Sequence, residues 1–136
     1  MAIVNTFERC LESPYLSEDA GARARVGPLL ATAADRLEAA ANLHQGGLPA
    51  DGADVVLLGY EAMFACLRAL VYSRGYREAG LRCLLLACEA LFVKTGDLDA
   101  ALLHDFERAQ RMRLSPEEAL ASASRFVRRT LELLKA

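Results

Sequence analysis

Apolar residues recur at intervals of three and four along most of the chain, and this spacing predicts α-helices. Two stretches rich in glycine and proline interrupt the pattern, residues 46–52 and, more weakly, residues 75–80. No segment alternates apolar and polar residues over the length of a strand, so we expect no β-strands. The sequence therefore predicts an all-α protein whose helices are joined by short connections.

The central helix of the core is predicted over residues 53–74. Its wide apolar stripe includes Val56, Met63 and Leu70, and a stripe of this width is typical of a helix buried on most sides. The other helices are expected over residues 5–12, 28–44, 81–94, 98–113 and 116–135. The short connections favour an antiparallel four- to five-helix up-and-down bundle, built as a single domain over 1–136.

Local signals mark several helix ends. The run Ser-Pro-Glu-Glu at 115–118 has the spacing of a capping box with proline at the first helical position, which predicts the start of the last helix. Gly96 suits a C-terminal stop, and Asp97 is expected to cap the helix that follows. Pro28 either starts the first long helix or breaks an earlier turn that begins near Ser17.

The chain has 136 residues, enough for one core, and a formal net charge of -2. This charge gives no overall attraction to nucleic acid, so such binding would need a local basic patch. Apolar residues make up 54% of the chain, but no stretch approaches the run of about 18 apolar residues that spans a membrane. The first residues lead directly to Glu8 and Arg9 and show no secretion signal. We expect a soluble, cytoplasmic protein.

The cysteines show no Cys-x-x-Cys spacing, and most of them lie among Leu, Ala and Phe in helical patterns, where thiols behave as small hydrophobic side chains. They are Cys10, Cys66, Cys83 and Cys88. We therefore expect buried, reduced thiols. His44 and His104 are distant in sequence from any cysteine pair, so no metal site is predicted, and no phosphate-binding loop or other cofactor motif is present.

The segment at 59–80, GYEAMFACLRALVYSRGYREAG, resembles the signature of HEPN domains, in which an aromatic-x-x-Met-Phe run leads to Arg-Ala-Leu and a Gly-Tyr-Arg-Glu turn. The likeness extends over nearly the whole chain, through Phe7–Cys10, Cys83–Leu84, Ala90–Val93 and Phe106–Ala109. It implies an antiparallel helical bundle that often dimerises. Members of this family occur beside minimal nucleotidyltransferases or as the ribonuclease toxin of a toxin–antitoxin pair.

The arginine–histidine pair of the family's ribonucleases is absent. In those members a histidine follows an arginine by four to six residues, whereas the matching Arg113 is followed there by Glu-Glu-Ala at 117–119. No other arginine reaches His44 or His104 at that spacing. Arginine cannot replace the base that histidine provides near neutral pH. We therefore expect no ribonuclease activity of the family type, and a surface position for His104.

Arg68 is the most informative charge in the chain, because it interrupts the apolar central helix. An unpaired guanidinium at a buried position would be costly. Arg68 therefore either extends its charged end to solvent or pairs with an acid such as Glu61 or Glu89, or it lines a cleft where it meets an anion such as a nucleotide phosphate.

Other basic and aromatic side chains are candidates for the same ligand. Three arginines, Arg74, Arg77 and Arg82, lie around the turn near Gly75. With Arg113 they form either an anion site or a solvated rim that includes Glu78. The tyrosines of the set either stack on a base or pack within the protein. The candidate ligand-binding residues are Tyr60, Arg68, Tyr76, Arg77, Arg82 and Arg113.

The favoured function is a non-catalytic HEPN-like module that binds a partner protein, a minimal nucleotidyltransferase, and a nucleotide or other anionic ligand. Two alternatives stay open. One is a divergent ribonuclease toxin that uses Arg113 with other residues, and the other is a purely structural helical homodimer or ligand-binding protein. We expect a homodimer and assign no catalytic residue, cofactor, metal or membrane partner.

Overall fold

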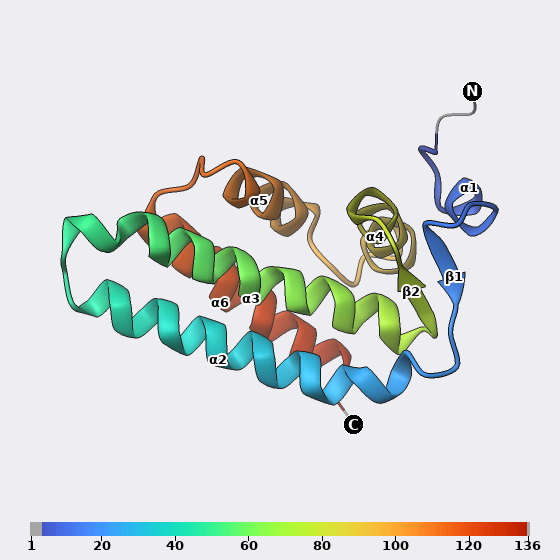
Figure 1. Ribbon diagram of the computed structural model, residues 1–136, viewed down its shortest axis with the longest axis horizontal. Helices are drawn as coiled ribbons and strands as arrows, with labels where there is room; N and C mark the ends of the chain where they lie inside the picture. Colours follow the sequence, from blue (N-terminus) through green and yellow to red (C-terminus); the bar gives the residue numbers. More distant parts are fainter. Residues whose placement is uncertain (1–3, 136) are drawn as a thin grey trace.

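The computed structural model describes residues 4–135, and helices make up most of this part of the chain (Figure 1). The prediction of a helical protein is confirmed. The domain was predicted over 1–136, of which Met1–Ile3 and Ala136 lie outside the described residues.

The α-helices follow the apolar periodicity, and α5 differs from its predicted bounds at both ends. Within residues 4–135 the α-helices are α1 (Phe7–Leu11), α2 (Val26–Gln45), α3 (Gly52–Ser73), α4 (Leu81–Cys88), α5 (Ala100–Gln110) and α6 (Pro116–Leu133). Short 3-10 turns precede α2 and α3, at Arg23–Arg25 and Pro49–Asp51, and a π-helical turn at Glu89–Val93 extends α4. Pro28 lies in the first turn of α2, where a helix has no acceptor for its backbone N–H groups.

The start of α5 is set by Asp99, whose carboxylate accepts a hydrogen bond from a backbone N–H of the first turn at 2.9 Å. The cap predicted at Asp97 is wrong, because this carboxylate instead accepts a hydrogen bond from the Thr95 hydroxyl at 2.9 Å. The helix also ends earlier than predicted. Shortly after its end, Met112 adopts a φ of 56°, in the left-handed region that does not continue an α-helix.

A small antiparallel sheet corrects the expectation that the chain has no β-strands. Its strands are β1 (Leu16–Glu18) and β2 (Tyr76–Glu78), with Leu16 opposite Glu78. Each strand has three residues, too few for an alternation of apolar and polar positions to be recognised. β2 also falls inside the glycine-bounded stretch 75–80, which the sequence pattern marked as a break.

The core is centred on α3, which contacts α2, α4, α5 and α6. Met63, Leu67 and Leu70 on this helix are all 0% exposed. α2 and α3 form an antiparallel hairpin, and α6 packs against both (Figure 1). Gly59 allows α3 to approach α6 closely, because a Cβ at this position would lie 3.2 Å from the backbone oxygen of Ala119.

The capping box predicted at the start of α6 is confirmed. The Ser115 hydroxyl accepts a hydrogen bond from the backbone N of Glu118 at 3.1 Å, and Glu118 Oε1 accepts one from the backbone N of Ser115 at 3.0 Å. The backbone N–H of Ser115, and secondarily its hydroxyl, hold the pKa of Glu118 below its usual value. The last helix therefore begins at the residue that the sequence indicates.

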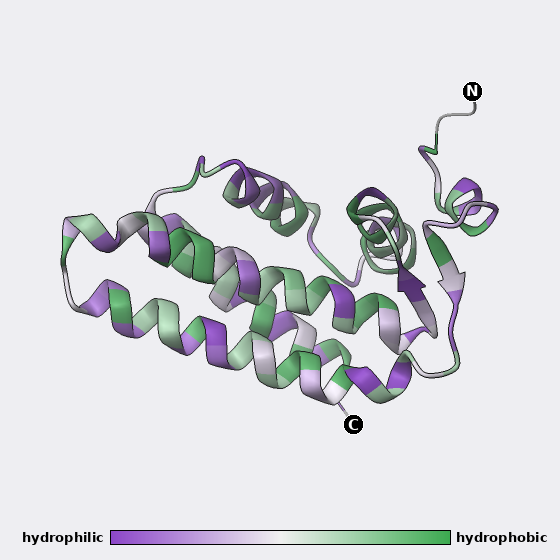
Figure 2. Cartoon of the chain, viewed as in Figure 1, coloured by the Kyte–Doolittle hydropathy of each residue, from purple (hydrophilic) through white to green (hydrophobic). Residues whose placement is uncertain are grey.

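α3 and the turn before it form one segment, Pro49–Ser73, that is long and apolar enough to cross a membrane by length and composition. The expectation that no stretch of the chain is long and apolar enough to span a membrane is therefore wrong. However, 67% of its most apolar window is buried inside the protein, as in the core helix of a soluble protein. Figure 2 shows hydrophilic positions interrupting the apolar ones along α2, which packs against α3.

Candidate functional site

A hollow of about 250 Å³ opens between α3, β2 and the start of α4, and we call it the arginine hollow. The charged and aromatic side chains that line it are Arg25, Phe64, Arg68, Tyr72, Arg77 and Glu78. Phe64, Arg68 and Tyr72 follow one another at intervals of four residues along α3, so they lie on one face of that helix. β2 supplies two more lining residues, and Arg25 comes from the 3-10 turn before α2.

Glu78 is the buried acid of the arginine hollow, with a side chain that is 6% exposed. Its Oε2 accepts a hydrogen bond from Arg68 Nε at 2.9 Å, and its Oε1 accepts one from the Tyr72 hydroxyl. A buried carboxylate needs such donors, because burial removes its hydration. Arg68 therefore pairs with an acid, as one interpretation of the sequence expected, but the acid is Glu78 and not Glu61 or Glu89.

The Arg68 guanidinium is held on one edge and on one face. Its Nε bonds Glu78, and its Cζ lies 4.4 Å from the centroid of the Phe64 ring. The side chain is 43% exposed, and within residues 4–135 no hydrogen-bond acceptor engages its two terminal nitrogens. These nitrogens are donors with which arginine binds phosphate or carboxylate oxygens.

The other two arginines add positive charge to the same hollow. Arg77 is 48% exposed, and its Nη1 lies 3.7 Å from Asp19 Oδ2, which is too long for a hydrogen bond. Arg25 is exposed, with its Cζ 5.8 Å from the centroid of the Tyr72 ring. The lining thus carries three positive side chains against one negative side chain. Asp19 lies outside the lining but forms an ion pair with Arg77, so one net positive charge remains, which favours an anion.

The Tyr72 hydroxyl stays protonated at neutral pH. Burial raises the pKa of Tyr72, and Glu78 raises it further through the hydrogen bond and its charge, while Arg68 and Arg25 offset part of the rise. A tyrosine in this state donates to Glu78 and is a poor general base. The arginine hollow therefore offers fixed donors and positive charge, and none of its lining residues is a histidine.

Tyr60 and Tyr76 pack against aromatic rings of the chain and do not line the arginine hollow. The Tyr60 ring stacks on Phe106, with centroids 4.9 Å apart, and meets Phe64 edge-on at 5.8 Å. Burial raises the pKa of Tyr60, and the charge of Arg68 offsets part of the rise. Tyr76 meets Phe7 edge-on, with centroids 5.5 Å apart. Of the two interpretations of these tyrosines, the contacts favour packing within the protein.

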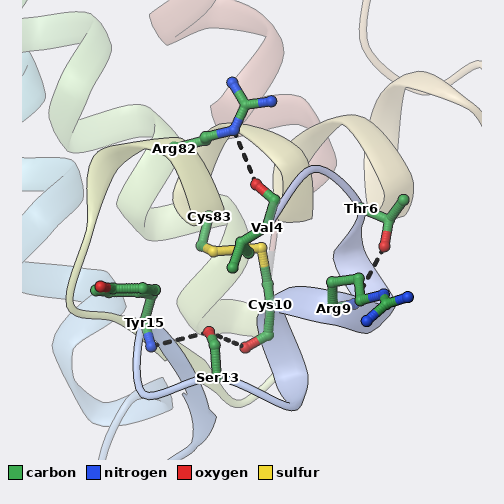
Figure 3. The surroundings of a disulfide bond; sticks show 8 residues. All are labelled: Val4, Thr6, Arg9, Cys10, Ser13, Tyr15, Arg82 and Cys83. Atoms are coloured by element: carbon green, nitrogen blue, oxygen red, sulfur yellow. Dashed lines mark hydrogen bonds between the residues drawn. A yellow bond between two sulfur atoms is a disulfide. The ribbon is translucent and has the colours of Figure 1, made fainter. Parts of the chain in front are cut away.

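Arg82 and Arg113 lie apart from Arg68 and Arg77. Arg82 is exposed, and its Nε donates a hydrogen bond to the backbone oxygen of Val4 at 2.9 Å (Figure 3). It lines a second hollow, of about 390 Å³, between α4 and α5. Arg113 is exposed on the connection between α5 and α6 and lines neither hollow. Of the predicted ligand residues, the structure thus brings only Arg68 and Arg77 together in the arginine hollow.

Sequence reasoning missed Arg25, Tyr72 and Glu78 as members of this site. Tyr72 lies four residues after Arg68, and this spacing was an available signal that both share a helix face. Arg25 precedes the predicted start of the first long helix, and nothing in the sequence connects it with α3. Glu78 is buried while Arg77 is exposed, because consecutive side chains of a strand point to opposite faces.

Cys10 and Cys83 form a disulfide that joins α1 to α4 (Figure 3). Their Cα atoms lie 5.6 Å apart, although 73 residues separate them in the sequence. The expectation of reduced thiols is therefore wrong for this pair, because spacing along the chain does not reveal which cysteines meet in the fold. Cys66 and Cys88 are buried free thiols, as expected, and burial raises the pKa of each to about 12.

Within residues 4–135, no group of three or more His, Cys, Asp or Glu side chains is placed to hold a metal ion. His104 is exposed on α5, as expected, and lines the hollow between α4 and α5. His44 Nε2 lies 4.0 Å from Glu117 Oε1. Neither histidine lines the arginine hollow.

No protein-family model, no curated protein and no solved structure matches the chain.

Proposed function

We propose that the chain is a non-catalytic, HEPN-like helical module that binds a small phosphate-bearing anion, such as a nucleotide, in the arginine hollow. A minimal nucleotidyltransferase is the proposed partner protein, and the partner supplies the chemistry. The proposed architecture is an antiparallel four- to five-helix up-and-down bundle, and the α2–α3 hairpin with α6 packed against it supports this architecture. The proposed location is the cytoplasm, and the proposed assembly is a homodimer.

The observation that carries the anion site is the way in which Arg68 is held. Glu78 and Phe64 fix its guanidinium before a ligand arrives, so less side-chain entropy is lost on binding. Its terminal nitrogens have no other acceptor within residues 4–135, and Arg77 lines the same hollow. Phosphate oxygens match the planar donor fork of arginine, so this arrangement favours a phosphate-bearing ligand.

The groups of the arginine hollow favour binding over catalysis. Glu78 already accepts hydrogen bonds from two donors, and burial raises the pKa of Tyr72, so neither group is a free base at neutral pH. Neither His44 nor His104 lines this hollow. A histidine beside the arginine is what the ribonuclease chemistry of the family would require.

Titration calorimetry with ATP tests the anion site, with adenosine as the uncharged comparison. Arg77→Met removes one cation and leaves the Arg68–Glu78 pair intact. We expect this variant to bind ATP about tenfold more weakly, the effect of losing one charge-assisted hydrogen bond. Arg111→Met is the matched control, because Arg111 is exposed and does not line the hollow. Absence of binding at millimolar ATP would rule the anion site out.

Two further measurements test the partner and the absence of catalysis. Co-expression with a nucleotidyltransferase encoded by a neighbouring gene should yield a complex that survives size-exclusion chromatography, and light scattering of the chain alone should give the mass of a dimer. Overexpression of the chain should not arrest growth. Toxicity that Arg113→Ala abolishes would support the ribonuclease alternative instead.

A further inference from the structure

The disulfide and the arginine hollow are connected through the N-terminal segment 4–18. This segment contains α1 and β1, and β1 pairs with β2, the strand that carries Arg77 and Glu78. After β2 the chain enters α4, whose third residue is Cys83. The disulfide to Cys10 therefore holds segment 4–18 against the helix that follows β2, while β1 holds the same segment against β2 itself.

The pairing of β1 with β2 sets the position of Glu78. Leu16 lies opposite Glu78 in the sheet and is 1% exposed. The backbone N of Ala79 donates a hydrogen bond to the backbone oxygen of Tyr15 at 2.8 Å, which continues the contact beyond the strands. Loss of this pairing would release Glu78 from its buried position, and with it the acceptor that orients Arg68.

The disulfide is a covalent cross-link between α1 and α4, in addition to the backbone that joins α1 to β1. α1 has five residues, too few for an isolated helix to be stable in water. Its other attachments include the edge contact of Phe7 with Tyr76 and, just before the helix, the hydrogen bond from Arg82 to Val4 (Figure 3). A cross-link that closes a long loop strongly restricts the freedom of the segments it joins.

We infer that the thiol–disulfide state of Cys10 and Cys83 sets the affinity of the arginine hollow for its anion, an inference that rests on the proposed function. With the disulfide formed, β1 holds β2 in register and Glu78 orients Arg68. With the pair reduced, segment 4–18 spends part of the time detached from β2. The anion then binds more weakly, because the fraction of molecules with an ordered site is smaller.

The redox partners are low-molecular-weight monothiols of the glutathione class. One thiolate attacks a sulfur of the disulfide, forms a mixed disulfide and releases one cysteine thiolate. A second monothiol thiolate then attacks the monothiol sulfur of the mixed disulfide. This step releases the other cysteine as a thiolate, and the two monothiols leave joined to each other by a disulfide. Two electrons thus pass from the two monothiols to the protein, and two protons end on Cys10 and Cys83. The oxidised monothiol reverses both steps.

Access of these thiols to the disulfide depends on local opening of α1. Cys10 is 0% exposed and Cys83 is 2% exposed, so a thiol reaches either sulfur only after α1 lifts from α4. In the cytoplasm, disulfides are characteristically transient, because the thiol pool reduces them. Cys66 and Cys88 are buried as separate free thiols, so the exchange concerns one pair of cysteines.

Calorimetric titration of the full chain with ATP, in two redox states, tests the inference. We expect the oxidised protein to bind about fivefold more tightly, or better, than the protein reduced with dithiothreitol. The double variant Cys10→Ser, Cys83→Ser cannot form the disulfide, so it should bind as weakly as the reduced protein and show no response to dithiothreitol. Cys66→Ala retains the disulfide and should retain the response.

The outcomes separate this inference from the proposed function. Equal affinity in the two states would overturn the redox inference and leave the anion site standing, whereas no binding in either state would overturn both. Hydrogen exchange distinguishes a local from a global effect of removing the disulfide. We expect faster exchange confined to residues 4–20 and 76–81. Faster exchange throughout α3 would overturn the inference, because weak binding would then reflect loss of the whole fold.

Discussion

Arg68 on the central helix and Glu78 on strand β2 form an ion pair in which Arg68 Nε lies 2.9 Å from Glu78 Oε2. The Tyr72 hydroxyl donates a hydrogen bond to the same carboxylate. Glu78 is 6% exposed and Arg68 is 43% exposed, so the acid is buried while the cation reaches solvent. Because of this asymmetry, the pair anchors β2 to α3 and leaves the outer donors of Arg68 open to a ligand.

The variant Glu78→Gln tests the anchor. The amide keeps the shape of the side chain but loses its charge, so we expect the free energy of unfolding to fall by about 1–3 kcal/mol. Glu61→Gln is the matched control, because Glu61 pairs with Arg36 at the surface, where the two side chains are 39% and 45% exposed. Its effect should stay below about 1 kcal/mol. Urea unfolding followed by circular dichroism measures both, and equal losses would argue against the anchor.

The Cys10–Cys83 disulfide determines which cysteines an alkylating reagent can modify. In urea without a reductant, iodoacetamide should modify only Cys66 and Cys88, because Cys10 and Cys83 are bonded to each other. After reduction, all four cysteines of the chain should react. Mass spectrometry of the intact protein counts the added groups. Modification of every cysteine before reduction would show that the pair is not bonded in solution.

The raised pKa values of the Cys66 and Cys88 thiols predict a loss of stability at alkaline pH. Burial raises their pKa from an ordinary value of 9.0 to about 12 in the folded protein. Above pH 9.0 the unfolded chain therefore releases thiol protons that the folded chain keeps, and the free energy of unfolding falls as the pH rises. Between about pH 8 and 9.5, below the titration of tyrosine, we expect a fall of about 1–2 kcal/mol.

Urea unfolding at the two pH values measures this effect, and the double variant Cys66→Ala, Cys88→Ala is its control. The variant should be less stable at both pH values, because it loses packing in the core. Its stability should nevertheless change little between them. A wild-type protein whose stability does not fall over this range would show that the two thiols titrate normally in the fold.

Ser115→Ala tests the capping box of α6. Loss of the hydroxyl leaves a backbone N–H of the first turn without its acceptor, so we expect the free energy of unfolding to fall by about 1 kcal/mol. Ser124→Ala, within the same helix, removes a serine that does not cap and should stay within about 0.5 kcal/mol of the wild type. Thermal and urea unfolding compare the two variants.

The pH dependence of the same variant gives a second readout. The folded protein holds the pKa of Glu118 below its usual value of 4.5, so the contribution of the box is present above that pH and is lost as the pH falls through the folded pKa. The variant keeps the backbone N–H of residue 115 and loses only the share of this lowering that the Ser115 hydroxyl contributes. The difference in stability between the wild type and Ser115→Ala should therefore shrink in part in acid. A difference that is the same in acid and at neutral pH would count against this linkage.

The helices were largely predictable from the sequence, because each repeats an apolar period over several turns. The helix predicted over 53–74 runs from Gly52 to Ser73. Helix ends depend on single contacts, and α5 was predicted to start too early because Asp97 and Asp99 are both suitable caps and only the fold selects Asp99. The strands β1 and β2 were missed because three residues carry no readable period.

The site was predictable only in part. Arg68 stood out because a charge inside an apolar stripe is visible without a structure. Its partner Glu78 lies beyond the turn after α3, and the burial of Glu78 depends on the pairing of β2 with a distant strand. Arg25 reaches the hollow from a third element, and Cys10 meets Cys83 across 73 residues. Such contacts between distant segments leave no local pattern in the sequence.

An NMR titration of the arginine Nε–H groups with ATP shows whether the arginine hollow binds an anion. We predict that the signals of Arg68 and Arg77 shift until the site is saturated. The signal of Arg111, which is exposed and does not line the hollow, should stay in place. Saturable shifts confined to arginines outside the hollow, or no saturable shift at any arginine, would show that the hollow is not an anion site.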